Sequence, residues 1–387
     1  MQNVFTFNLE TTTFFGAHAH KKLPEIIQNN SWRQLALIID KGVVDTAVAR
    51  ELLEELKRQA EIFVFEARST EEPDYEYLEN CRIQFEDRLF DCMIGIGGGS
   101  TLDLSKAIAV LINNCAKAIE YRGFDLVKNP GIPMIAIPTT AGTGSEITPY
   151  AVFIDKKERR KMGINGRYVR AKFAILDPVF TLSCPHRVTV SSGMDALTHT
   201  LESYVAKNAT PISQIFAREA FRLIFNSLPK VIKDPANIEL RFQMLLGSFY
   251  AAISLMNSGA GPAGALSYPL GVYFKVPHGL AGGFFLSHIA EYNVKGGYEG
   301  YCQIYDDIEG VGIGLSLQEK CQDFVHRLFR LTEGIGVPKA LNEFGVAKKD
   351  IDFLADKTVE HLRPALEQNP VIFERNNVLE LLNRLTI

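Results

Sequence analysis

Short apolar runs alternate with helical stretches through the first 180 residues, and this alternation restricts the fold more than any other feature. The runs are continuous rather than alternating, which is typical of strands buried on both faces of a parallel sheet. Candidate strands are residues 35–39, 62–65, 93–96 and 133–137, and candidate helices are residues 44–59, 75–88 and 101–113. Repeated strand, crossover helix and strand predict a doubly wound parallel sheet with helices on both faces.

The pattern changes near residue 181, where strand signals fade and long helical periods take over. Candidate helices are residues 191–205, 212–228, 239–257, 279–292, 317–334, 349–363 and 377–385. We therefore predict two domains, an α/β domain over residues 1–182 and an all-helical domain over residues 183–387. Residues 258–264, SGAGPAG, contain three glycines and a proline and look more flexible than the rest of the chain. They permit either close backbone packing or an irregular loop that lines a cleft.

Composition excludes several classes of function. A net charge of −4 and a pI near 6.1 give no electrostatic basis for binding nucleic acid or an anionic membrane. We see no signal peptide and no apolar run long enough to span a membrane. The six cysteines are scattered without a CxxC pair, so we expect free thiols in a reducing compartment and a cytoplasmic protein.

Two loops follow candidate strands and could contact a ligand. Gly97, Gly98, Gly99 and Ser100 come between a strand and a helix, where exposed backbone N–H groups and the helix dipole favour a pyrophosphate. Residues 139–145, TTAGTGS, follow the next strand and offer hydroxyl groups. The glycines match neither G-x-G-x-x-G nor the P-loop pattern, so a simple tight turn remains the alternative.

Asp40 ends the strand at residues 35–39. A carboxylate at the end of an early strand could accept hydrogen bonds from the ribose diol of a dinucleotide. The alternative is a helix N-cap or a solvated loop charge.

Asp195 and His199 are four residues apart in a predicted helix and so lie on one face, with Glu202 further along the same stripe. This spacing lets one helix supply two ligands to a divalent metal. His278, between Pro277 and Gly279 at the start of an apolar helix, is the candidate third ligand. The alternatives are a metal-free ion pair and a hydrogen-bonded structural histidine.

Taken together, five motifs resemble the iron-containing, or group III, alcohol dehydrogenases over essentially the whole chain. They are GIGGGSTLDLSKAIAV (95–110), IPTTAGTGSEIT (137–148), AILDP (174–178), GMDALTHTLESY (193–204) and PHG (277–279). The resemblance implies a Rossmann-like domain and a helical domain in the dehydroquinate synthase-like arrangement. It also implies NAD(P), a divalent metal such as Fe²⁺ or Zn²⁺, and interconversion of alcohols with aldehydes or ketones.

The resemblance also assigns roles to single residues. It implies metal ligation by Asp195, His199 and His278. Asp40 corresponds to an acid that repels the 2′-phosphate of NADP, which favours NAD. The implied cofactor residues are Gly97, Gly98, Gly99, Ser100, Asp103, Thr139, Thr140, Thr143, Lys161 and Leu182.

The chain departs from the family at two histidines. Gly264 stands where the family has a fourth metal ligand, and Tyr268 where it has a histidine near the substrate. Three protein ligands are still a normal count for catalytic zinc, although metal occupancy should be weaker. Tyr268 could take over proton transfer as a catalytic residue, or it could simply line the cleft. Glu72 replaces an asparagine that many members have.

We therefore expect an NAD(P)-dependent alcohol dehydrogenase or aldehyde reductase, acting on a polar substrate such as a sugar, a sugar acid or a phosphonate aldehyde. The alternatives are a non-catalytic NAD-binding protein with a degenerate metal site, and a lyase resembling the dehydroquinate synthases. We expect no nucleic-acid or membrane partner, and the resemblance suggests a homodimer.

Overall fold

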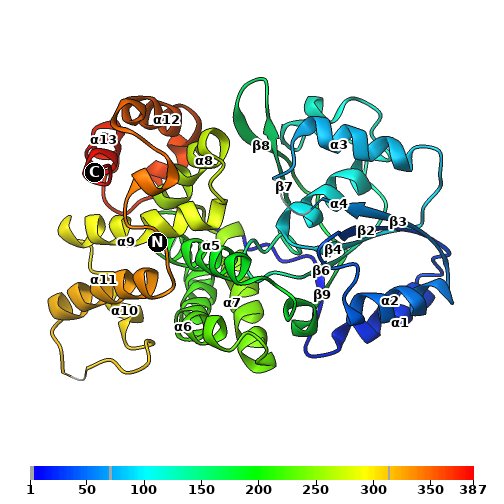
Figure 1. The fold of residues 1–387 in the computed structure, drawn as a ribbon, viewed down its shortest axis with the longest axis horizontal. Helices are drawn as coiled ribbons and strands as arrows, with labels where there is room; N and C mark the ends of the chain where they lie inside the picture. Colours follow the sequence, from blue (N-terminus) through cyan, green and yellow to red (C-terminus); the bar gives the residue numbers. More distant parts are fainter. Residues whose placement is uncertain (1–3, 69–71, 313) are drawn as a thin grey trace. The chain divides into compact units, whose positions relative to one another are not determined.

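The computed structural model describes residues 4–68, 72–312 and 314–387. The chain divides into two compact units (Figure 1). The α/β unit consists of Leu9–Pro185 and Ala236–Leu245, and the helical unit consists of the residues up to Asn8, His186–Pro235 and Leu246–Ile387. The boundary expected between residues 182 and 183 stays a prediction.

The α/β unit is built on a six-stranded sheet with parallel pairing throughout. Its strands are β1 (Thr12–Phe15), β2 (Gln34–Asp40), β3 (Glu61–Ala67), β4 (Cys92–Gly97), β6 (Met134–Pro138) and β9 (Phe173–Leu176). The order across the sheet is β1-β9-β6-β4-β2-β3, so the strand order reverses between β2 and β4. Ligands of α/β proteins bind beyond the carboxyl ends of the strands at such a reversal. The predicted doubly wound sheet is confirmed.

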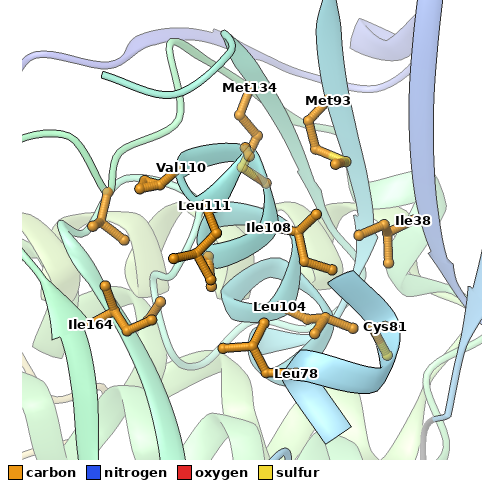
Figure 2. Packing of buried hydrophobic residues seen from close by; sticks show 14 of the residues in the cluster. Ile38, Leu78, Cys81, Met93, Leu104, Ile108, Val110, Leu111, Met134 and Ile164 are labelled. Carbon is orange, nitrogen blue, oxygen red and sulfur yellow. The ribbon is translucent and has the colours of Figure 1, made fainter. Parts of the chain in front are cut away.

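Helices cover both faces of this sheet because both faces of its strands are apolar. These helices are α1 (Leu23–Asn29), α2 (Ala47–Lys57), α3 (Tyr75–Arg82) and α4 (Gly99–Leu111). Along β2, Leu35, Leu37 and Ile39 are fully buried with α1 and α2, while Ala36 and Ile38 are fully buried with α3 and α4. Figure 2 shows the second cluster, in which the apolar side of α4 lies between the sheet and α3. α4 is therefore held firmly behind the glycine loop that precedes it.

The sequence prediction missed a second, three-stranded sheet in the same unit. Its strands are β5 (Gly123–Phe124), β7 (Tyr150–Asp155) and β8 (Arg160–Asn165), in the order β5-β8-β7. β7 and β8 form an antiparallel hairpin with Tyr150 opposite Asn165. Only alternate residues of β7 are fully buried. Neither strand therefore gives the continuous apolar run that marks the central strands.

The helical unit confirms the predicted second half of the fold. Its helices are α5 (His186–Val205), α6 (Pro211–Lys233), α7 (Ile238–Met256), α8 (Pro262–Phe274), α9 (His278–Lys295), α10 (Cys302–Tyr305), α11 (Leu317–Gly334), α12 (Ile351–Glu367) and α13 (Arg375–Arg384). α7 belongs to both units, because its residues up to Leu245 lie in the α/β unit. None of the described helices is long and apolar enough to cross a membrane.

Of the two alternatives for residues 258–264, the irregular loop is wrong for the last three residues, because α8 begins at Pro262 with Gly261 as its N-cap. Proline is well suited to the first position of a helix, where its missing N–H costs no hydrogen bond. Gly264 and Pro269 both lie inside α8. These residues are poor helix formers, so the local sequence predicts a loop although tertiary packing produces a helix.

The expectation that all six cysteines are free is also wrong, because Cys302 and Cys321 form a disulfide that closes a separation of 19 residues. The two cysteines lie on α10 and α11. Among the described residues, Cys81, Cys92, Cys115 and Cys184 are not part of a disulfide. The spacing within the pair carries no recognisable motif, so nothing in the sequence predicts that they pair.

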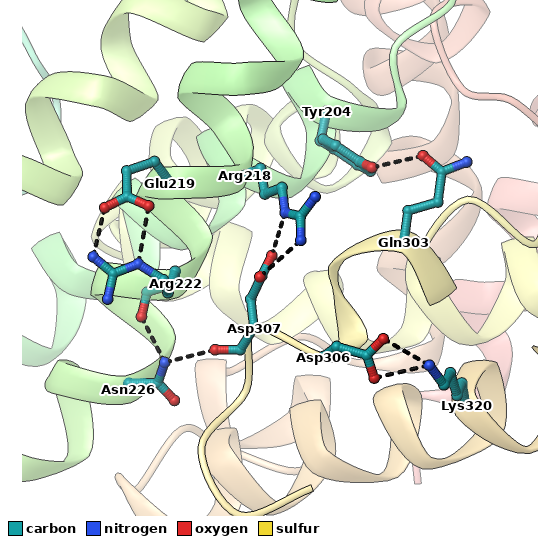
Figure 3. Close-up of polar contacts among 9 residues, drawn as sticks. All are labelled: Tyr204, Arg218, Glu219, Arg222, Asn226, Gln303, Asp306, Asp307 and Lys320. Carbon is teal, nitrogen blue, oxygen red and sulfur yellow. Dashed lines mark hydrogen bonds and ion pairs between the residues drawn. The ribbon is translucent and has the colours of Figure 1, made fainter. Parts of the chain in front are cut away.

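Polar contacts hold α10 and the two residues that follow it against the rest of the helical unit (Figure 3). The Tyr204 hydroxyl donates to Gln303 Oε1 at 3.0 Å. Arg218 donates two hydrogen bonds to Asp307, at 2.7 and 3.0 Å. Such two-pronged contacts fix orientation more strongly than a single bond. The disulfide and these contacts constrain the same short region.

Candidate metal centre and nucleotide loops

Helix α5 carries two side chains with metal-binding potential on one buried face. Asp195 is 5% exposed, and its Oδ1 lies 3.7 Å from Nε2 of His199 one turn later. The apolar residues Ala196, Leu197 and Leu201 are buried around them. The i, i+4 spacing noted in the sequence therefore brings a carboxylate and an imidazole together inside the helical unit.

The start of α9 brings a second imidazole to the same place. Its first residue, His278, follows Pro277, which is the N-cap, and His278 Nε2 lies 3.9 Å from Asp195 Oδ1. Gly279 makes this approach possible. A Cβ atom there would lie 2.1 Å from the carbonyl oxygen of Ser191 and 2.6 Å from Cβ of Asp195. A larger residue would push α9 away from α5.

Ligand atoms of Asp195, His199 and His278 all lie within 4.8 Å of one another. Bonds of about 2.1 Å in a tetrahedral site separate the ligand atoms by roughly 3.4 Å. The separations of 3.7 and 3.9 Å are close to that value. The three side chains therefore fit one divalent ion with only small movements.

Glu202, the third polar residue of the α5 stripe, is not one of the three candidate metal ligands and bonds to the backbone of another helix. Its carboxylate accepts hydrogen bonds from the backbone N–H groups of Gly261, Ala263 and Gly264 at 2.9, 2.6 and 3.1 Å. These are N–H groups at the start of α8, which a helix cannot satisfy internally. Burial raises the pKa of Glu202, although the three N–H groups oppose that shift. One α5 residue thus caps another helix.

Gly264 lies directly against that cap. A Cβ atom built on Gly264 would be 3.0 Å from Glu202 Oε2, so a side chain there would require the carboxylate to shift. Tyr268, one turn further along α8, packs edge-on against the His278 ring, with ring centroids 5.0 Å apart. Of the two positions where the family has histidines, Tyr268 therefore contacts the cluster, and Gly264 lies beside Glu202.

The two nucleotide-loop candidates lie side by side in the α/β unit. The backbone N–H of Thr139 donates to the carbonyl oxygen of Gly97 at 3.0 Å. Gly98 is the N-cap of α4, which begins at Gly99. Because β4 and β6 are paired neighbours, with Gly97 opposite Pro138, the loops that follow them meet at one edge of the sheet.

Gly99 is required by a threonine of the second loop, whereas Gly98 has room for a side chain. A Cβ atom on Gly99 would lie 2.6 Å from Cγ2 of Thr143, whereas one on Gly98 would meet Thr140 only at 3.4 Å. Two loops with larger residues could not approach so closely. Backbone N–H groups and hydroxyls are therefore concentrated at the N-terminus of α4, an arrangement that suits an anion.

Asp40 lies at the end of β2, beside the point where the strand order reverses. Its Oδ1 accepts from the N–H of Gly42 at 2.7 Å, and its Oδ2 lies 3.5 Å from the Thr101 hydroxyl. The carboxylate therefore adjoins the first turn of α4, next to the glycine loop.

Asp103 bonds to protein groups beneath the loops. It accepts hydrogen bonds from the Ser145 hydroxyl at 2.5 Å and the Val152 N–H at 2.9 Å, and pairs with Lys106 at 3.2 Å. Burial lowers the pKa of Lys106 and raises the pKa of the neighbouring Glu146 to about 7. Lys106 and Glu146 look like ordinary surface charges in the sequence, so their burial beside Asp103 was not predicted. Through the hydrogen bond from Ser145 to Asp103, this buried cluster supports the loop of residues 139–145.

Lys161 and Leu182 lie elsewhere in the α/β unit. Lys161 is on β8, and its ammonium lies 2.5 and 2.7 Å from the two carboxylate oxygens of Glu72. The residue that departs from the family pattern thus pairs with the lysine assigned to the cofactor. Leu182 follows a short 3₁₀ turn and is 37% exposed.

Comparisons with known proteins agree with this architecture. A model of iron-containing alcohol dehydrogenases matches residues 10–178, and a model of the C-terminal part of the Fe-containing alcohol dehydrogenase family matches residues 189–386. The fold and these matches define an NAD(P)-dependent oxidoreductase that interconverts alcohols with aldehydes or ketones. The chain belongs to the iron-containing alcohol dehydrogenase family, and the resemblance seen in the sequence is confirmed.

Individual relatives match over nearly their full length. The NAD-dependent methanol dehydrogenase of Bacillus methanolicus is 28% identical over 97% of this chain and 98% of its own. The sulfoacetaldehyde reductase of Bilophila wadsworthia is 30% identical over 95% of each chain. The crystal structure of a Bifidobacterium kashiwanohense sulfoacetaldehyde reductase with NAD⁺ matches with a TM-score of 0.89, at 26% identity and 99% coverage of both chains.

Proposed function

We propose that the protein interconverts a small polar aldehyde and its alcohol with NAD(H), using Fe²⁺ or Zn²⁺ held by Asp195, His199 and His278. The observation that carries the proposal is the group of three ligand atoms within 4.8 Å of one another. One carboxylate and two imidazoles form a ligand set suited to either metal. With Gly264 in place of a fourth protein ligand, a coordination position is left for a substrate oxygen.

The residues of the chain have distinct roles in this proposal. When bound, the metal polarises the substrate oxygen and NAD(H) exchanges the hydride. Tyr268, whose ring contacts His278, supplies a phenolic proton to the substrate oxygen. Gly97, Gly98, Gly99 and Ser100 bind the pyrophosphate at the start of α4, and Asp40 binds the ribose diol and disfavours a 2′-phosphate. Thr139, Thr140 and Thr143 line the cofactor site, and the family resemblance alone assigns Lys161 and Leu182 to the cofactor.

The polar substrate is supported by the two positions where this chain lacks a histidine. Tyr268 adds a hydroxyl group beside the cluster, and Gly264 removes an imidazole. Two relatives bear the name sulfoacetaldehyde reductase, and sulfoacetaldehyde is an aldehyde with an anionic group. Sugar aldehydes, sugar acids and phosphonate aldehydes share this combination of a carbonyl with polar or charged neighbours.

The first test is the metal content of protein purified without added metal, measured by elemental analysis. The wild type should contain one equivalent of iron or zinc, and Asp195→Ala should contain none. Asp323→Ala is the matched control, because it removes a carboxylate from α11 in the same unit, and it should retain the metal. If the wild type bound neither Fe²⁺ nor Zn²⁺ even when loaded, the metal role would be lost and a binding-only protein would remain.

The second test is a substrate panel with the loaded enzyme. Sulfoacetaldehyde, a phosphonate aldehyde and a sugar aldehyde should each be reduced with a higher kcat/KM than butanal. Rapid turnover of butanal with no activity on the polar aldehydes would overturn the substrate class, while the NAD-dependent chemistry would stand.

We also propose a cytoplasmic location, on the basis of the scattered cysteines, of which four are outside the disulfide, and a homodimer, on the basis of the family resemblance. Light scattering after size-exclusion chromatography measures the oligomer directly, and a monomer at micromolar concentration would overturn the second proposal.

A further inference from the structure

His278 offers both of its ring nitrogens to specific partners. Its Nε2 faces the metal cluster, 3.9 Å from Asp195 Oδ1. Its Nδ1 lies 2.7 Å from the hydroxyl oxygen of Ser267, a fully buried residue of α8. A histidine binds a metal only through a nitrogen that carries no proton, so the position of the ring proton decides whether Nε2 is available.

The hydrogen bonds of Ser267 determine which ring nitrogen of His278 carries the proton. The Ser267 hydroxyl has one proton, and its oxygen lies 2.6 Å from the carbonyl oxygen of Gly264. A carbonyl oxygen can only accept, so the Ser267 proton lies in that contact. The short contact with His278 therefore requires the proton to be on Nδ1, with the serine oxygen as acceptor. This assignment leaves the lone pair on Nε2.

We propose that Ser267 is a positioning residue, which fixes the Nδ1–H tautomer of His278 and so prepares Nε2 to bind the metal. The proposal deepens the proposed function and rests on it for the identity of the bound group. Ser267 does not contact the metal or the substrate. It acts through His278, as second partners of metal-binding histidines generally do.

His199 provides an internal contrast. Its Nδ1 is buried and has no hydrogen-bond partner among the described residues, so no protein group fixes its tautomer there. His278, the histidine whose tautomer is fixed, is therefore the ligand contributed by α9, whereas the other two ligands both come from α5. Because the His278 ring is already oriented before a metal binds, it compensates in part for the missing ligand at position 264.

The same arrangement explains how Ser267 is placed. Ser267 lies three residues after Gly264, a spacing at which a serine hydroxyl reaches back to a carbonyl of the preceding turn. The chain of bonds runs from His278 Nδ1 to the Ser267 oxygen and on to the Gly264 carbonyl. Hydrogen bonds in such a chain polarise one another, which strengthens the contact with the histidine.

The decisive measurement is the tautomer of His278 in metal-free protein, read by long-range ¹H–¹⁵N correlation of ¹⁵N-histidine-labelled samples. His278→Gln identifies the signals. The wild type should carry its ring proton on Nδ1. An Nε2–H tautomer in the wild type would overturn the proposal without need of any further variant.

Ser267→Ala and Ser287→Ala then separate the hydroxyl from general effects. Ser287 is a buried serine of α9 whose hydroxyl has no hydrogen-bond partner among the described residues, so its substitution is the matched control. Ser267→Ala should move a substantial share of His278 to Nε2–H and weaken Zn²⁺ binding, measured by chelator competition, roughly 10–100-fold. Ser287→Ala should change neither.

The outcomes separate the role of Ser267 from the proposed metal function. An unchanged tautomer and unchanged Zn²⁺ affinity in Ser267→Ala would overturn the role of Ser267. A wild type with the Nδ1–H tautomer that binds no Zn²⁺ would support the hydrogen-bond assignment and overturn the proposed metal function instead.

Discussion

Replacing Gly99 and Gly98 separately by alanine tests whether the glycine loop is dictated by contact with the second loop. The two residues are adjacent, and both have a backbone conformation that alanine can adopt. Their surroundings differ. The new Cβ at Gly99 would lie 2.6 Å from Thr143 Cγ2 and 2.7 Å from its Oγ1, whereas the new Cβ at Gly98 would lie 3.4 Å from the nearest atom of Thr140.

These distances set the expected size of the effect. Carbon atoms in contact are normally about 3.5–4.0 Å apart, so Gly98→Ala should change the free energy of unfolding by less than about 0.5 kcal/mol. Gly99→Ala overpacks the loop and should cost about 1–3 kcal/mol, which lowers the Tm of a unit of this size by roughly 2–12 °C. Both variants gain the same small stabilisation from a stiffer unfolded chain, so their difference reports the contact at Gly99, set against the smaller cost of replacing Gly98 as the N-cap of α4.

Calorimetry of the protein without cofactor is the assay, because a bound ligand would mask the effect. The double variant Gly99→Ala with Thr143→Ala should recover most of the loss. Thr143→Ala alone is needed as a reference, since the Thr143 hydroxyl accepts from the Ser145 N–H at 3.2 Å. Equal Tm values for the two glycine variants, or no recovery in the double variant, would refute the reasoning.

Three other changes have defined outcomes. Asp40→Ala should raise the kcat/KM for NADP relative to NAD roughly tenfold, because a charge repelling the 2′-phosphate is removed; steady-state kinetics with both cofactors check it. Burial lowers the pKa of His288 from 6.5 to about 4. Because the unfolded chain therefore binds this proton more readily, the free energy of unfolding keeps its full value above pH 6.5 and decreases by up to about 3 kcal/mol as the pH falls towards 4. His288→Leu should flatten the decrease of Tm between pH 7 and 5. Reducing the Cys302–Cys321 disulfide should destabilise the helical unit by about 3 kcal/mol, as the 19-residue separation implies; Tm with and without dithiothreitol measures it, and alkylation should label neither cysteine beforehand.

Much of the fold was predictable because its main elements carry strong periodic signals. The central strands are continuous apolar runs, and α11 was predicted with the bounds that the structure gives, Leu317–Gly334. α8 and the β7–β8 hairpin were missed for different reasons. α8 is rich in glycine and proline, and it is helical because of its packing and the Glu202 cap. The hairpin was missed because burial alternates along β7, so the strand has no continuous apolar run.

The candidate metal residues were predictable because two of them share one helical face, a relation that spacing alone reveals. The sequence could not place Ser267, because its role depends on α8 being a helix and on the distance from α8 to the start of α9. The pairing of Lys161 with Glu72 was likewise unforeseen, since these residues are 89 positions apart. Contacts between distant segments require the fold.

The path of the chain between the two units has a consequence for any attempt to divide this protein. Neither unit is one continuous stretch, because Ala236–Leu245 returns to the α/β unit inside α7. In that unit, Phe242 packs edge-on against Phe15 of β1, with ring centroids 4.9 Å apart. A gene fragment ending at Pro185 would leave Phe15 without this cover and is expected to aggregate. Chimaeras made with a relative must exchange residues 9–185 and 236–245 together, so recombination at a single crossover will yield mismatched units.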